Sequence, residues 1–148
     1  MTDNAAMLYQ WREVRLKLQS EFTKDNLQKV LDWWESTKYH THGFNFDDMS
    51  TWTDVWQYIS DGYYTKSGNG LAMFFTIFYA DEDKEVELWL IHDLFHSDIY
   101  LVVYVDGYIL NRLNGEVEKY EDVKKDLNIL SVHRKYDIIN AIKKNNQG

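Results

Sequence analysis

The sequence lacks cysteine altogether, and this absence removes several classes of protein at once. None of its 148 residues can form a disulfide, bind a metal as a thiolate or act as a cysteine nucleophile. The N-terminus also lacks the basic segment followed by an apolar one that marks a secretory signal, so we expect none. The longest apolar run, Leu71 to Ala80, is about half the length that a bilayer span needs and is expected to lie in the core.

The residues that are present are those of a folded domain. Apolar residues make up 45% of the chain, charged residues 27% and aromatic residues 16%, which argues against disorder. The length predicts a single domain over 1–148. The net charge of −8 disfavours direct binding to nucleic acid, because such binding depends on cations that neutralise phosphates. An ordinary solvated surface, nucleic-acid mimicry and a basic protein partner are all compatible with this charge.

Two amphipathic helices are predicted at the N-terminus. The first has an apolar side formed by Leu8, Trp11, Val14, Leu18 and Phe22. The second has an apolar side formed by Leu27, Val30, Leu31 and Trp34. Thr23 can cap the second helix, and the short linker between the two predicts a helical hairpin over 1–36.

A further helical segment is expected over 47–80. Its first part repeats the helical spacing at Trp52, Val55, Trp56 and Ile59. Residues 67–79 fit a helix by their spacing and a buried strand by their continuous apolar character, and we favour the helix.

An antiparallel sheet is predicted over 85–120. Residues 86–90 alternate between apolar and polar or aromatic side chains, and 99–105 are rich in β-branched and aromatic residues. Asp106 and Gly107 then form the two-residue sequence that favours a tight hairpin into 108–112. With a C-terminal helix over 133–145, the fold class is α+β, an antiparallel sheet of three to five strands packed against several helices.

The histidines are the only residues that suggest a metal. His40 and His42 share a loop, and His92 and His96 flank Asp93, so two pairs could converge on one ion as in a metal-dependent enzyme. Their spacing matches no known zinc motif. We therefore predict no metal and no cofactor, and no catalytic residues.

The order of helix, histidine-bearing strand and hairpin resembles the layout of transglutaminase-like and papain-like cysteine enzymes. In that layout a cysteine opens the central helix, a histidine starts a strand, and an aspartate or asparagine follows on the next strand. His96 and Asn111 match the last two positions, whereas the first falls near Tyr63 to Ser67, where there is no cysteine. The resemblance implies a shared architecture whose thiolate chemistry is lost, with Ser67 as the replacement to consider.

A second resemblance is to small uncharacterised proteins of contractile-tailed (myovirus-like) bacteriophages. It rests on a double-tryptophan helix, a tryptophan-rich second helix, an apolar segment and a hairpin, at Asp32 to Trp34, Trp52 to Trp56, Ile59, Gly70, Leu71, Thr76 and Tyr108 to Asn111. The similarity spans about residues 30 to 130 and contains no catalytic signature. It implies a viral origin, with the host cytoplasm or the virion as the location.

Several aromatic residues lie off the predicted apolar stripes and could form a contact surface. They are Trp33, Tyr39, Phe44, Phe46 and Trp89. From these residues and the phage resemblance we predict a non-enzymatic protein-binding protein, a tail or baseplate component or an assembly factor. Its partner would be a viral structural protein or a host target, with no membrane and no nucleic acid. The alternatives are an inhibitor or modulator of a host protein and a metal-dependent enzyme that uses the histidines.

Overall fold

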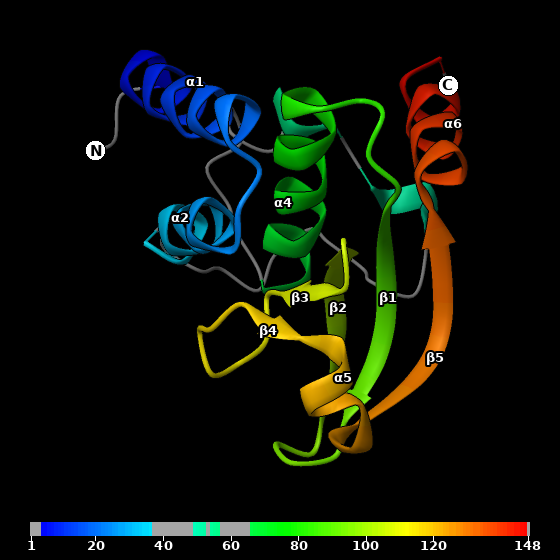
Figure 1. The fold of residues 1–148 in the computed structure, drawn as a ribbon. Coiled ribbons are helices and arrows are strands. Elements are labelled where there is room, and N and C mark those ends of the chain that lie inside the picture. Colours follow the sequence, from blue (N-terminus) through cyan, green and yellow to red (C-terminus); the bar gives the residue numbers. More distant parts are fainter. Residues whose placement is uncertain (1–3, 37–48, 53, 57–65, 148) are drawn as a thin grey trace.

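A computed structural model describes residues 4–36, 49–52, 54–56 and 66–147. Its central element is helix α4 (Lys66–Ala80), which lies between a pair of helices and an antiparallel sheet (Figure 1). Nearly every side chain of α4 is buried, because its neighbours cover it on both sides. This complete burial explains why the same apolar run also fitted a buried strand in the sequence.

The pair of helices consists of α1 (Asn4–Ser20) and α2 (Lys24–Glu35). Thr23 begins α2 as its N-cap, since its hydroxyl accepts a hydrogen bond of 3.2 Å from the Asn26 N–H. Both helices send a tryptophan onto α4. The two helices, Asn4–Ser20 and Lys24–Glu35, lie within the range predicted for a helical hairpin and are joined by a short link.

Thr76 is the point at which these three helices meet. Its Oγ1 accepts hydrogen bonds from the indole Nε1 of Trp11 (2.8 Å) and of Trp34 (3.0 Å), and it donates one to the Ala72 carbonyl (2.8 Å). All three side chains are fully buried. One hydroxyl thus satisfies two indole donors inside an apolar core.

The sheet contains five antiparallel strands in the order β4-β3-β2-β1-β5. Their bounds are β1 (Val86–Asp93), β2 (Asp98–Val105), β3 (Tyr108–Leu110), β4 (Glu118–Lys119) and β5 (Leu127–Arg134). Asp106 and Gly107, with φ of 52° and 83°, form the tight turn between β2 and β3. The predicted α+β fold with an antiparallel sheet of up to five strands is confirmed.

The sheet separates two apolar clusters. Leu88, Leu101 and Val103 face α4 and belong to the larger cluster. Trp89 and Tyr100 face the other side, where the short helix α5 (Tyr120–Val123) contributes Val123. The remaining described elements are the 3-10 helices η1 (Met49–Thr51) and η2 (Lys124–Asp126) and the C-terminal helix α6 (Lys135–Gln147).

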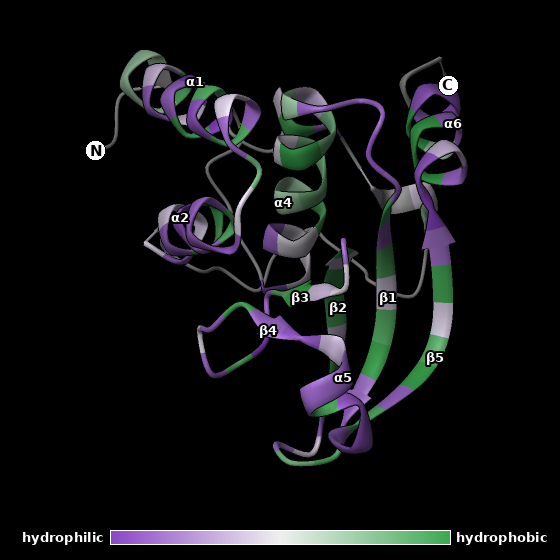
Figure 2. Ribbon diagram, viewed as in Figure 1, coloured by the Kyte–Doolittle hydropathy of each residue, from purple (hydrophilic) through white to green (hydrophobic). Residues whose placement is uncertain are grey.

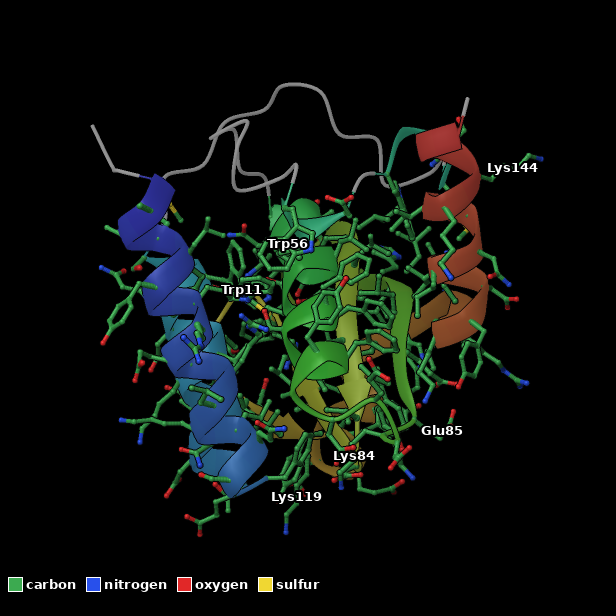
Figure 3. The ribbon with its side chains drawn as sticks, turned by 90° about the horizontal axis from the view of Figure 1, so that it is seen from above. Trp11, Trp56, Lys84, Glu85, Lys119 and Lys144 are labelled. Carbon is green, nitrogen blue, oxygen red and sulfur yellow. The ribbon has the colours of Figure 1, made fainter. Side chains whose placement is uncertain are left out.

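Two predictions about tryptophans are wrong. Trp89, expected on a solvent face, is only 7% exposed, because Tyr104 stacks on it at 4.3 Å and Tyr120 packs edge-on at 5.1 Å. Trp56, expected in the core, is 47% exposed, although it meets Trp11 edge-on at 4.8 Å (Figure 3). Burial on both faces of the sheet, rather than on one, accounts for the first error.

Other expectations differ in their bounds or are described only in part. β3 ends at Leu110 rather than at 112, because Asn111 has a φ of 79° and leaves the strand conformation. The structure adds an eight-residue strand, β5, beyond the sheet expected over 85–120. Much of the helix expected over 47–61 lies outside the described residues. None of the described helices has the length and apolar character that a membrane span requires.

Candidate active site

The start of α4 carries Ser67, the last residue of the stretch near which the transglutaminase-like layout would place its nucleophile. Ser67 lies in the first helical turn and is 7% exposed. Its Oγ accepts a 3.2 Å hydrogen bond from the Leu101 N–H of β2, which ties the helix end to the sheet. Since the hydroxyl accepts through its oxygen in this bond, its proton stays available for transfer. The dipole of a helix also favours negative charge near its N-terminus.

Asn111 contacts the same residue of β2 as Ser67 does, Leu101. Its fully buried amide donates two hydrogen bonds of 2.8 Å through Nδ2, one to the Leu101 carbonyl and one to the Lys66 carbonyl. These two acceptors determine the orientation of the amide. Its Oδ1 is buried and has no hydrogen-bond partner among the described residues. Asn111 therefore binds the start of the central helix through the Lys66 carbonyl.

Gly70 permits this close contact between α4 and the sheet. A Cβ at position 70 would lie 2.9 Å from the Asn111 Nδ2 and 3.0 Å from the Leu101 carbonyl oxygen. Both separations are too short for a carbon atom, so only glycine lets the first turn of α4 approach β2 this closely.

Lys66 precedes Ser67 and is the nearest titratable group along the chain. Its Nζ forms an ion pair with Glu35 at 2.8 Å and donates to the Arg112 carbonyl at 3.1 Å. Burial lowers the pKa of Lys66, while the Glu35 carboxylate opposes this effect. A lysine whose pKa is lowered is more readily in the neutral form, which can accept a proton.

A second polar cluster surrounds Asp93 at the end of β1. This fully buried carboxylate accepts hydrogen bonds from Tyr100 Oη (2.7 Å) and from Arg112 Nη2 (3.3 Å), and it pairs with His96 Nδ1 at 2.8 Å. Burial alone would raise the pKa of Asp93, but these partners hold it at about 2. The pKa of Tyr100 is raised by burial and by its bond to Asp93.

The two clusters meet at Tyr100 and Arg112. The Arg112 carbonyl accepts from Lys66 Nζ at 3.1 Å while its guanidinium binds Asp93, and Lys66 Nζ lies 6.0 Å from the centroid of the Tyr100 ring. The side chain of His96, in the turn between β1 and β2, pairs with Asp93.

The other histidines do not converge in the described part of the chain. His92 lies within β1, and His133 lies on β5 with its ring 5.4 Å from that of Trp52. Burial lowers the pKa of His133. His40 and His42 lie outside the described residues. Within the described ranges, no group of three or more histidine, aspartate or glutamate side chains could hold a metal ion.

The predicted contact surface is described only in part. Trp33 is half-buried, and its indole N–H donates to Gln10 Oε1 at 3.1 Å. Tyr39, Phe44 and Phe46 lie outside the described residues. Since Trp89 is buried, the five aromatics do not form the surface as it was predicted, and a binding role for Trp33 stays a prediction.

The chain was compared with known families, curated proteins and solved structures. No family model matches it, and no curated protein matches it. Among solved structures, Legionella pneumophila LapG superposes with a TM-score of 0.69 at 14% identity, covering 98% of this chain and 91% of the other. Calcium-bound LapG gives a TM-score of 0.74 at 15% identity, with coverages of 97% and 92%. The EGTA-treated form gives 0.73 at 16% identity, with coverages of 98% and 91%.

The chain has the LapG fold. At 14–16% identity these matches show a similarity of fold, which is consistent with the resemblance to the transglutaminase-like layout. The predicted function is wrong, because these neighbours point to an enzyme rather than to a non-enzymatic phage protein. No finding supports a myovirus family or a role in the virion.

Sequence reasoning did not single out three residues that the structure places in these clusters: Lys66, Tyr100 and Arg112. The signal for Lys66 was its position directly before Ser67, at the start of the predicted helix. Tyr100 and Arg112 gave no signal, because a tyrosine in a β-rich segment and an arginine after a hairpin are ordinary.

Proposed function

We propose that the chain is a hydrolase of the LapG fold that cleaves peptide or related acyl bonds, with the Ser67 hydroxyl as its nucleophile. The observation that carries the proposal is the position of Ser67, in the first turn of the buried central helix of a fold that LapG shares over more than 90% of both chains. Because the chain contains no cysteine, a thiolate cannot be the nucleophile, and Ser67 is the hydroxyl that stands at the start of this helix.

Lys66 is the proposed general base. In its neutral form, Nζ takes the Ser67 hydroxyl proton while Oγ bonds to the substrate carbonyl carbon, and the lysine then gives that proton to the leaving amine as the C–N bond breaks. Water later releases the acyl group by the same steps in reverse. The helix N-terminus stabilises the oxyanion of each tetrahedral intermediate.

The position of Glu35 makes a specific test of the base possible. Its carboxylate stabilises the charged form of Lys66 across 2.8 Å, so it works against proton uptake by that lysine. We expect kcat/KM to rise with pH along a limb that reports the Lys66 pKa, below the ordinary value for lysine. Glu35→Gln should move this limb to lower pH, because removing the carboxylate lowers the pKa of Lys66 further.

The nucleophile can be tested directly with a fluorophosphonate, which labels activated serines. We expect covalent labelling at Ser67, located by mass spectrometry of the digested protein, and none in Ser67→Ala. Hydrolysis of p-nitrophenyl acetate should fall roughly a thousandfold in Ser67→Ala and in Lys66→Arg. Ser67→Cys is the matched gain-of-reactivity variant, and iodoacetamide should modify it at position 67.

Two outcomes would contradict this function. Labelling spread over several serines, and unchanged in Ser67→Ala, would show that Ser67 is not activated. Hydrolysis that depends on pH in the same way in Glu35→Gln as in the original protein would remove Lys66 from the mechanism.

A further inference from the structure

Strand β5 forms one edge of the sheet. It follows β1 at the end of the strand order, and in the described part of the chain no element pairs with its outer side (Figure 1). The strand is eight residues long, which leaves a row of main-chain N–H and C=O groups turned outward. Such an edge is a template on which a further strand can bind.

The side chains of β5 lack the usual protection of an edge strand. Within Leu127–Arg134 there is neither a proline nor a lysine, and the only fully charged side chain is Arg134, at the end. Ile129 is 37% exposed, Leu130 47% and Val132 45%. Figure 2 shows the apolar stretch of β5 between hydrophilic ends.

A β-bulge aligns two of these side chains. The pairing passes from Leu90 opposite Ser131 to Ile91 opposite Ile129, so Leu130 is the extra residue. As a result, Val132 opposite Trp89 and Ile129 opposite Ile91 share one face of the sheet. They extend the apolar surface of that face to its rim.

The charges around this edge differ from those of the whole chain. The net charge of the chain is −8, yet η2 and β5 (residues 124–134) contain three basic residues and a single acidic one, and of these Lys124 is paired with Glu121 at 2.7 Å. Lys124 and Lys125 precede the strand, and the side chain of Arg134 at its far end is 80% exposed. A second copy of this chain would bring two such basic segments together, whereas an acidic ligand would meet complementary charge at both ends.

We propose that β5 binds an extended polypeptide segment that adds a sixth strand to the sheet, with apolar side chains at alternate positions and acidic residues at its ends. The main chain of the segment pairs with the outer edge of β5. Its apolar side chains contact Ile129 and Val132, and its acidic ends lie near Lys125 and Arg134. This site is separate from Ser67 and does not depend on the proposed hydrolysis.

The test uses a fluorescent peptide with alternating valine and threonine residues flanked by glutamates. Its affinity for the full chain is measured by fluorescence anisotropy, beside a peptide with lysine flanks and one with a proline in the core. We expect the glutamate-flanked peptide to bind about tenfold more tightly than the lysine-flanked one, and the proline peptide not to bind. Hydrogen exchange should slow in residues 127–134 when the first peptide is added.

Variants of the protein locate the site. Leu130→Lys should abolish binding, because an edge lysine opposes strand addition, whereas Leu113→Lys, at a residue 40% exposed and outside β5, should leave it intact. The double variant Lys125→Glu and Arg134→Glu should reverse the preference between acidic and basic flanks. Ser67→Ala should bind like the original protein, so failure of the proposed hydrolysis and failure of this site are distinguishable.

Three results would overturn the proposal. The first is equal binding to Leu130→Lys and to the original chain, and the second is no saturable binding at up to about 1 mM peptide. The third is a dimer in which β5 exchanges slowly without any peptide, since a second copy would then occupy the edge.

Discussion

Replacing Thr76 by valine tests the polar centre of the helical layer. Valine has almost the same shape as threonine, so the substitution leaves no cavity and removes only the hydroxyl. Two buried indole N–H groups, on Trp11 and Trp34, then lose the acceptor that they share. The Ala72 carbonyl loses one donor but stays within its helix.

The expected loss of stability is large for one oxygen atom. A buried donor deprived of its acceptor costs about 1–3 kcal/mol, so two donors predict about 2–6 kcal/mol. That is a substantial part of the roughly 5–15 kcal/mol that stabilises a domain. Thr76→Ser is the matched control, because it keeps the hydroxyl and loses one methyl group, at about 1 kcal/mol.

Urea unfolding followed by far-UV circular dichroism measures the difference between the two variants. Trp34→Phe added to Thr76→Val should cost less than Trp34→Phe alone, because the indole N–H no longer has that acceptor to lose. If Thr76→Val lies within about 1 kcal/mol of Thr76→Ser, the indoles find other acceptors and the reasoning fails.

Three further predictions concern the sheet. Gly107→Val should destabilise the chain by about 1–3 kcal/mol, because position 107 has a φ of 83°; an unchanged melting temperature would contradict this. Trp89→Ala should cost about 3–4 kcal/mol and Trp56→Ala clearly less, since the first is 7% and the second 47% exposed; chemical denaturation of both gives the order. Asp93 is more acidic in the folded chain, with a pKa of about 2, than unfolded, so its stabilisation is complete above about pH 5 and is lost as the pH falls through 2. The stability advantage over Asp93→Asn should therefore shrink by about 2 kcal/mol in acid unfolding, and a constant advantage would refute it.

The sequence predicted those parts of the fold that local chemistry determines. A few neighbouring residues determine each of three features: the cap at Thr23, the apolar stripe from Leu27 to Trp34, and the turn at Asp106 and Gly107. The strand β5 was only partly predicted, because an edge strand with exposed apolar residues does not alternate as a half-buried strand does.

The candidate site was predictable in outline but not in its connections. The matches at positions 67 and 111 followed from the order of elements, and the structure joins them through Leu101. His96 lies in the turn between β1 and β2 and pairs with Asp93, a contact that the resemblance did not include. The partnership of Lys66 with Glu35 joins residues 31 apart in sequence, which no local pattern can show.

The fit of Gly70 against Leu101 and Asn111 separates what can change in this fold from what cannot. The serine at position 67 stands one turn before a residue that has no room for a single added carbon. A lineage can exchange the reactive atom at 67 for another of similar size without disturbing the scaffold, whereas a side chain at 70 would push the helix off the sheet and carry position 67 with it. Close packing constrains position 70 more than position 67, so a search for distant relatives should follow the glycine rather than the serine.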